Sequence, residues 1–349
     1  MRLKAFIFVF SKECNLLNKD SWNPGKLLDI SGSYWQACTL HAGVHLEIFS
    51  LIGDDQLRGG EIAQKLGADT RGVKLLLNAL TAMGLLVTCE GLYSNTAKAK
   101  TFLVKTSAEY IGHIIMHHHH LVHAWSQLSQ AVLTGKPVRK RASFGEAKER
   151  QSFLMGMFNL AMLIAPKLVR QVDLKRRHHL LDLGGGPGTY AIHFCLANPR
   201  LRATVYDLPT TRPFALQTID RFHLGDRIDF IAGDYVEEDI TGTYDVVWLS
   251  HILHGEGPEA CKRIITKAVS ALEPDGLILI HDFVLDNSLD GPLFPALFSL
   301  NMLINTDEGR SYSEAQITEM LTRVGVKDIR RMPFRGPNDS SILYGIVAG

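Results

Sequence analysis

The stretch that most constrains the fold is a short apolar run that ends in a cluster of glycines. Residues His179–Leu183 predict a buried parallel strand, and glycines follow at positions 184, 185, 186 and 188. Glycine suits such a turn because it tolerates positive φ and leaves the backbone open to a ligand. Residues Tyr190–Ala197 then predict a helix whose free N–H groups point toward the turn. The stretch therefore predicts a strand–turn–helix cradle for a ligand.

An acid at the end of the next strand narrows the class of ligand. Residues Leu201–Tyr206 predict a second strand, and Asp207 closes it, 19 residues after Gly188. An acid at this place in a Rossmann-like fold accepts hydrogen bonds from ribose hydroxyls, so we expect a nucleoside-containing ligand. The glycines follow a G-x-G-x-G pattern, with Thr189 where the dinucleotide pattern has its third glycine. This spacing argues against a nicotinamide-dependent oxidoreductase, which stays as an alternative.

Strands and helices alternate through the rest of the chain. Further strands are predicted at 228–232, 244–249 and 277–282, with a turn at 273–276 and helices at 212–223, 258–271, 292–304 and 313–324. Two last β-like runs, 327–333 and 341–348, predict an antiparallel hairpin. The pattern predicts an α/β fold for residues 173–349. Its core is a Rossmann-like doubly wound seven-stranded sheet with a C-terminal antiparallel hairpin.

The N-terminal half predicts mainly helices. Apolar residues recur at helical spacing over 26–52, and helices at 60–66 and 71–83 are followed by a hairpin over 85–93. This order predicts a winged-helix-like domain over 26–105. The second helix carries only Arg71 and Lys74 as cations, which favours dimerisation over DNA binding, although a DNA-binding regulator stays as a weaker alternative. Residues 1–25 are interpreted as an extension, and 106–172 as a helical connector that lines the acceptor pocket. The connector begins with a long helix predicted over 107–134.

Composition and charge exclude several other classes. The net charge of +1 gives no drive toward nucleic acid or an anionic membrane, and we expect no apolar segment that approaches the roughly 20 residues of a membrane span. Five cysteines without a C-x-x-C pair are typical of a reduced, cytoplasmic protein. The run His117–His120, with His113 and His123, has i, i+4 pairs that can bind a metal. We assign no metal, because a helix with one or two histidines facing a pocket explains the run more simply.

In combination, these features resemble the class I S-adenosylmethionine-dependent methyltransferases. More narrowly, they resemble the small-molecule O-methyltransferases of the plant caffeate and bacterial antibiotic-tailoring type. The resemblance spans residues 27–347 and is carried by Phe158-Asn-Leu-Ala-Met162, Leu181-Asp-Leu-Gly-Gly-Gly-Pro-Gly188, Asp207-Leu-Pro209, Gly233-Asp234, His251-Ile-Leu-His254 and Glu308-Gly-Arg-Ser311. It implies S-adenosylmethionine as cofactor, a homodimer formed through the N-terminal domain, and methylation of a small-molecule hydroxyl. The same scaffold also serves S-, N- or C-methylation.

The resemblance also implies roles for single residues. His254 would be the general base and Asp282 the acid that orients it, with His251 as the competing base on the same helical face. A histidine of pKa about 6.5 can accept the proton of a phenol of pKa about 10. Cofactor contacts would come from Gly184, Gly186, Asp207, Leu208, Asp234, Tyr235 and Ser250. The acceptor would contact Phe158, Met162, His251, Phe298, Met302 and Asn305.

Three positions depart from the family pattern. Ser250 stands where many relatives have a lysine, and Gly255-Glu256 stands where they have Asp-Trp. Gly309 stands where a second acid is expected, and Glu308 would have to take its place. The base is therefore a weaker prediction than the cofactor site.

Overall fold

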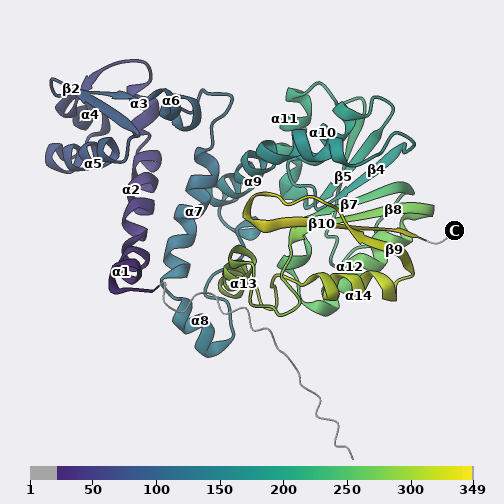
Figure 1. Cartoon of the computed structure of the whole chain (residues 1–349). Helices are drawn as coiled ribbons and strands as arrows, with labels where there is room; N and C mark the ends of the chain where they lie inside the picture. The colour runs from purple at the N-terminus through teal and green to yellow at the C-terminus, as the bar shows by residue number, and fades with distance from the viewer. Residues whose placement is uncertain (1–21, 348–349) are drawn as a thin grey trace, which may run out of the picture.

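The structure, a computed structural model, describes residues 22–347. Most of the predicted extension 1–25 and the last two residues therefore lie outside the described residues. Figure 1 shows a mainly helical N-terminal unit on one side and a sheet with its covering helices on the other, with helices α7 and α9 between them.

The sheet has seven strands in the order β6-β5-β4-β7-β8-β10-β9. The first five run parallel, and β10 is antiparallel to both β8 and β9, which confirms the predicted doubly wound sheet and its terminal hairpin. The strands are β4 (His179–Leu183), β5 (Arg202–Asp207), β6 (Ile228–Ala232), β7 (Tyr244–Ser250), β8 (Leu272–Phe283), β9 (Val326–Arg331) and β10 (Ser340–Val347). Their helices are α10 (Thr189–Ala197), α11 (Arg212–Arg221), α12 (Pro258–Ser270), α13 (Leu293–Asn305) and α14 (Glu314–Arg323).

Both faces of the sheet are covered, which explains its apolar strands. In β4, Leu180 belongs to the core that includes α10 and α11, whereas Leu181 belongs to the core that includes α12 and α14. Successive side chains of a strand point to opposite faces, so a strand buried on both faces is apolar throughout. The strand order reverses between β4 and β7, and doubly wound sheets bind ligands in the crevice at such a point.

One predicted turn lies inside a strand. Residues 273–276 are part of β8, where Tyr244 pairs with Leu272 but Val246 pairs with Leu277. The extra residues form a bulge, and Asp275 has φ of 61°. The turn-favouring residues 273–276 therefore form a bulge inside β8, and not a turn that precedes the strand.

The N-terminal unit contains helices and a small sheet of order β1-β3-β2. Its elements are α1 (Pro24–Gly32), α2 (Tyr34–His45), α3 (Ile48–Ile52), β1 (Leu57–Arg58), α4 (Gly59–Leu66), α5 (Thr70–Ala82), β2 (Leu86–Cys89), β3 (Leu92–Asn95) and α6 (Ala97–Leu103). The Asp69 side chain accepts a hydrogen bond from Gly72 N at 2.8 Å and so caps α5. The single helical region expected over 26–52 is three helices, and Glu47, with φ of 55°, separates the last two.

The connector consists of α7 (Gly112–Trp125), α8 (Leu128–Thr134) and α9 (Ala147–Leu168), so the helix predicted over 107–134 is two helices. Helices α7 and α9 cross closely at Gly156, where a Cβ atom would lie 3.1 Å from Ile114 Cα. Contrary to the expectation from sequence, one segment of the described residues, Ala147–Gln171, is long and apolar enough to cross a membrane. This segment packs against α7 and α10, and a long apolar helix inside a folded protein packs in the same way.

Candidate active site

The candidate catalytic histidines follow strand β7, where the chain leaves the sheet. His251 has φ of 58°, and its backbone N–H donates to His281 O of β8 at 2.8 Å. A left-handed backbone at a non-glycine residue costs on the order of 1–3 kcal/mol and persists only where its surroundings hold it. His254 lies in the following 3-10 turn, Leu253–Gly255. The two histidines therefore do not share a helical face, and that expectation is wrong.

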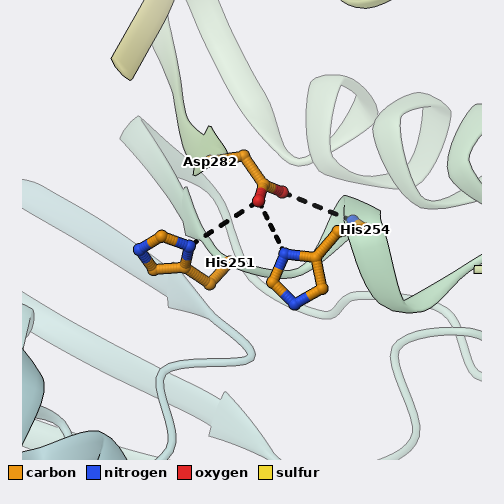
Figure 2. Close-up of side chains that lie close together, drawn as sticks. All are labelled: His251, His254 and Asp282. Atoms are coloured by element: carbon orange, nitrogen blue, oxygen red, sulfur yellow. Dashed lines mark hydrogen bonds and ion pairs between the residues drawn. The ribbon is translucent and has the colours of Figure 1, made fainter. Parts of the chain in front are cut away.

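Both histidines face the carboxylate of Asp282 at the end of β8 (Figure 2). His254 Nδ1 lies 2.6 Å from Asp282 Oδ1, and His251 Nδ1 lies 3.6 Å from the same oxygen. The second distance fits an ion pair with a protonated ring but is too long for a hydrogen bond. Burial of Asp282 would raise its pKa, but the charges of the two histidines and the hydrogen bond with His254 outweigh burial and lower the pKa. Asp282 is thus an ionised, buried acceptor.

Backbone groups complete the surroundings of this carboxylate. Phe283 N donates to Asp282 Oδ1 at 2.8 Å, and His254 N donates to Asp282 Oδ2 at 3.3 Å. The carboxylate therefore holds both the ring and the backbone of His254. This arrangement leaves Nε2 as the ring nitrogen of His254 that can accept a proton.

Aromatic rings border the histidine pair. Phe298 of α13 lies 4.7 Å from the His254 ring, and Phe283 lies 4.4 Å from the His251 ring, between ring centres. Phe283 in turn contacts Phe298 at 4.6 Å and Phe294 at 4.9 Å. The sequence analysis identified Phe298 but missed the other two. Phe294 could have been found from its i, i+4 spacing to Phe298, and Phe283 from its place beside Asp282.

The other acceptor-site predictions in α13 have local partners. Asn305 donates through Nδ2 to Asn301 O of its own helix at 2.6 Å, and Met302 is buried. Trp125 of α7 donates through Nε1 to Asn301 Oδ1 at 3.1 Å. This bond ties the connector to the helix that carries Phe298.

Phe158 and Met162 of α9 point toward α10 and α11. Arg221 lies over the buried Phe158 ring at 5.9 Å, and Met162 Sδ lies 3.3 Å from His193 Nε2. These contacts place Phe158 and Met162 beside the helices that follow strands β4 and β5, and their contact with the acceptor stays a prediction. Phe153, earlier on α9, instead meets His117 of α7 with 5.3 Å between ring centres.

The glycine turn has the backbone that a ligand cradle requires. Gly184 and Gly186 have φ of 65° and 55°. A Cβ atom on Gly184 would collide with Ile252 and lie 3.2 Å from Tyr235, whereas one on Gly186 would meet nothing within 4 Å. A side chain at position 186 would therefore meet open space, and the Tyr235 ring lies close to the nearby Gly184.

Asp207 lies at this turn, as predicted, and already accepts three hydrogen bonds. Its Oδ2 accepts from Gly186 N at 2.8 Å, and its Oδ1 accepts from Leu208 N at 2.7 Å and from Thr211 Oγ1 at 2.9 Å. A carboxylate has about four acceptor positions, so about one stays free for a ribose hydroxyl. Burial raises the pKa of Asp207, against the lowering effect of these bonds.

Other predicted cofactor residues differ in the hydrogen bonds that they already make within the protein. Asp234 Oδ1 accepts from Val236 N at 2.9 Å and so shapes the loop after β6. The Ser250 hydroxyl already has a hydrogen-bond partner within the protein, because it lies 3.0 Å from Nδ1 of the buried His281. The other ring nitrogen of His281 lies 3.0 Å from Ser340 Oγ, so this network joins β7, β8 and β10.

Gly309 leaves no room for the second acid expected there. A Cβ atom at this position would lie 2.7 Å from His254 O and 2.9 Å from Gly255 O. The Glu308 side chain lies against Gly257 instead. Within residues 22–347 no hydrogen bond or ion pair links Glu308 to His254, so the structure does not support the substitution.

Arg141 of the connector clasps the loop that carries His254. Its Nη1 lies 2.5 Å from Glu256 Oε1, and its Nη2 donates to Gly255 O at 2.5 Å and to Glu256 Oε2 at 3.2 Å. Glu256 stands where relatives have a tryptophan, so this clasp accompanies the departure from the family pattern. We call these contacts the Arg141 clasp.

The histidine run lies on α7, as predicted, between α2 and α9. Burial lowers the pKa of His117 to about 3, so its ring is neutral at physiological pH. His119 faces α2, where its ring lies 5.7 Å from His41 and 5.2 Å from His45. Burial also lowers the pKa of His41 and His119. The run therefore packs between helices as neutral rings.

Comparisons with known proteins match most of the chain. A family model of the O-methyltransferase domain matches residues 125–327, and one of the O-methyltransferase dimerisation domain matches 28–105. The chain is 32% identical to a 3-hydroxy-5-methyl-1-naphthoate 3-O-methyltransferase of Streptomyces sahachiroi, over 93% of this chain and 96% of that protein. It is 29% identical to the N,N-dimethyltransferase OxyT of Streptomyces rimosus, over 74% and 78%.

A solved structure agrees over the same range. The structure of PigF with SAH superposes with a TM-score of 0.84 and 26% identity, covering 93% of this chain and all of that one. The match to a dimerisation domain supports a homodimer formed through the N-terminal unit. The domain match, the similar relatives and the shared fold agree with the open glycine turn and the acid Asp207 beside it: the chain belongs to the O-methyltransferase family, and S-adenosylmethionine is its methyl donor.

Proposed function

We propose that this enzyme methylates a hydroxyl group on a small aromatic molecule, with His254 as general base. The observation that carries the proposal is the 2.6 Å contact between His254 Nδ1 and the buried, ionised Asp282. The rings of Phe283, Phe294 and Phe298 beside it favour a flat, apolar acceptor. The relative from Streptomyces sahachiroi is named for O-methylation of a hydroxynaphthoate, which agrees with this choice.

Each group would have a defined task. S-adenosylmethionine supplies an electrophilic methyl group when bound. Its binding residues would be Gly184, Gly186, Asp207, Leu208, Asp234 and Tyr235. Asp282 holds Nδ1–H of His254, so Nε2 is free to accept the hydroxyl proton of the acceptor, and the carboxylate then stabilises the imidazolium. The aromatic rings exclude water from the developing phenolate and hold the acceptor in place.

N-methylation is the second candidate. OxyT, at 29% identity, is named an N,N-dimethyltransferase. A neutral amine reacts through its lone pair before it loses a proton, so such a reaction depends less on His254. S- and C-methylation stay as further alternatives on the same scaffold.

We also propose a cytoplasmic enzyme that acts without membrane or nucleic acid. The four cysteines of the described residues are free thiols, as in reducing compartments. Helix α5 follows α4 and precedes a hairpin, in winged-helix order, but its buried residues are Val73, Leu77 and Leu80. A helix that buries this face within its own unit supports a dimerisation role for the winged-helix-like domain.

The test replaces His254 with asparagine, which keeps a side-chain N–H for Asp282 but cannot accept a proton. With hydroxynaphthoates as acceptors, we expect His254→Asn to lower kcat at least about 10²-fold, with the affinity for S-adenosylhomocysteine unchanged by calorimetry. An acceptor whose hydroxyl is already ionised at neutral pH should recover most of this loss. Equal loss on both acceptors, or normal turnover on the first, would contradict the base role.

A further inference from the structure

Three side-chain atoms from two segments converge at one point in the site. His251 Nδ1 and His254 Nδ1 come from the turn after β7, and Asp282 Oδ1 comes from the end of β8. These atoms all lie within 4.8 Å of one another (Figure 2). We propose that they form a site for a divalent transition-metal ion, best suited to Zn²⁺, and that the bound ion inhibits methyl transfer. The inhibition, though not the binding, rests on the proposed base role of His254.

Two of the three distances between the ligand atoms lie close to those of a metal site. A tetrahedral Zn²⁺ with bonds of about 2.0–2.2 Å places neighbouring ligand atoms about 3.3 Å apart. The two contacts to Asp282 Oδ1, 2.6 Å from His254 and 3.6 Å from His251, lie on either side of this value. Shifts of less than an ångström in these two contacts would therefore meet it. Three protein ligands also leave the fourth position open for water or the acceptor oxygen.

Among the described residues, His251 Nδ1 has no hydrogen-bond partner, and Asp282 has no cationic partner besides the two histidines. His251 Nδ1 is buried and has no hydrogen-bond partner, so its lone pair or proton faces Asp282 unsatisfied. The side chain of Asp282 is only 5% exposed, and within residues 22–347 its ion pairs are to these two histidines alone. No lysine or arginine in that range neutralises this carboxylate. A cation at the convergence point would satisfy both the orphaned nitrogen and the buried negative charge.

His251 adds a third potential metal ligand to the proposed catalytic pair, His254 and Asp282. Deprotonation of the acceptor requires only His254 and Asp282. His251 is nonetheless held toward the same oxygen by a left-handed backbone and by a tilted ring contact with Phe283, at 4.4 Å between ring centres. Two imidazoles with one carboxylate favour Zn²⁺ and its neighbours over Mg²⁺ or Ca²⁺, which prefer all-oxygen sites.

Metal binding opposes the base role of His254. The ion takes the lone pair of His254 Nδ1, so the neutral ring must carry its proton on Nε2 instead of on Nδ1. Asp282 then binds the ion and no longer accepts a hydrogen bond from the ring. Because Nε2 is already protonated, His254 cannot accept the acceptor proton there, so turnover stops while the methyl-donor cradle stays intact.

Direct binding is tested with Co²⁺, whose visible absorption reports four-coordinate nitrogen and oxygen ligands. Titration of the full-length protein should show one such site per chain, and Zn²⁺ should displace the Co²⁺. His251→Gln keeps a polar side chain but removes the ring nitrogen, and we expect it to weaken Co²⁺ binding at least tenfold. The matched control is His119→Gln, in the histidine run of α7, which should bind Co²⁺ as the unaltered protein does. Loss in the control but not in His251→Gln, or no Co²⁺ spectrum at all, would overturn the site.

Inhibition is tested separately. Zn²⁺ should inhibit methylation of hydroxynaphthoates with the same dependence on concentration as its displacement of Co²⁺, and a chelator should restore the rate. Each variant is compared with its own metal-free rate, so that an effect of His251→Gln on turnover does not count. A Co²⁺ site lost in His251→Gln supports the metal site even if His254 is not the base. Binding of Zn²⁺ without inhibition would overturn the inhibitory role and count against the base.

Discussion

Asp182, at the end of β4 beneath the glycine turn, is a buried acid with one satisfied oxygen. Its Oδ2 accepts from Ala191 N of α10 at 3.1 Å, and its Oδ1 is buried without a partner. Burial raises the pKa of this carboxyl to about 7. The folded protein therefore binds a proton here between about pH 4 and pH 7 that the unfolded chain has released. Linkage then makes the protein less stable as the pH rises through that window.

Replacement of this acid should remove that pH dependence. A shift of about three units corresponds to at most about 4 kcal/mol of stability lost between pH 4 and pH 8. Asp182→Asn keeps an acceptor for Ala191 N but carries no charge, so we expect it to lose less stability than the unaltered protein over this range. Urea unfolding at pH 5 and pH 8 measures the difference. Parallel changes in the two proteins would show that Asp182 is not protonated in the fold.

Sequence reasoning located the ends of strands better than the directions of side chains. Asp207, His254 and Asp282 follow or end predicted strands, and parallel strands of one sheet bring such ends together. Phe158 and Met162 were predicted to contact the acceptor from a motif on a helix, where a shift in register of a few residues turns a side chain to another face. Only packing decides that register, so their contact with the acceptor stays a prediction, whereas their contacts with Arg221 and His193 are observed.

At the scale of elements, the periodicity of apolar residues predicted whether a segment is a helix or a strand. It did not predict where a helix is interrupted. The region 26–52 has apolar residues at helical spacing throughout, so nothing in the pattern marked the left-handed Glu47. The helix over 107–134 was likewise expected to be continuous, but α7 ends at Trp125, whose indole bonds to Asn301 of α13. The end of α7 thus coincides with a contact to a segment distant in sequence, which a local pattern does not reveal.

The Arg141 clasp joins two elements and should couple their functions. Arg141→Gln and Glu256→Gln each remove one side of a partly buried ion pair, and we expect each to lower kcat/KM about tenfold because the loop holding His254 loosens. The double variant should lose little more than either single one, since both remove the same contact. A double-mutant cycle on kcat/KM should therefore give a coupling energy of about 1–2 kcal/mol. Strictly additive losses would mean that the clasp does not position the loop.

At the scale of the whole molecule, the N-terminal helices expose more apolar surface than a monomer would. Leu28, Tyr34 and Trp35 of α1 and α2 are 70%, 60% and 68% exposed. Such a patch marks an interaction surface, and its place within the matched dimerisation domain points to the second subunit. In a two-fold interface each substitution acts twice.

We therefore expect Leu28→Glu with Trp35→Glu to weaken the dimer at least a hundredfold, since burial of each such side chain contributes about 1.5–3 kcal/mol. Light scattering after gel filtration measures the change. The control is Leu216→Glu on α11, an exposed leucine outside the dimerisation domain, which should stay dimeric. A dimer that survives the double substitution would place the interface elsewhere.

The overall architecture was predictable because few topologies fit a run of alternating strands and helices that ends in a hairpin. The length of the chain and the order of its strands then required helices on both faces of the sheet, and the structure has them. The position of the connector relative to the sheet was not predictable. It depends on the close approach of α7 and α9 and on the Arg141 clasp, and neither leaves a periodic signal.

The crossing at Gly156 has a mechanical consequence. Because α7 and α9 touch there almost backbone to backbone, no long side chain lies between them whose rotation could absorb a displacement. Helix α9 in turn packs against α10, which follows the glycine turn. We therefore expect a displacement of the N-terminal unit to reach the glycine turn through α7, α9 and α10.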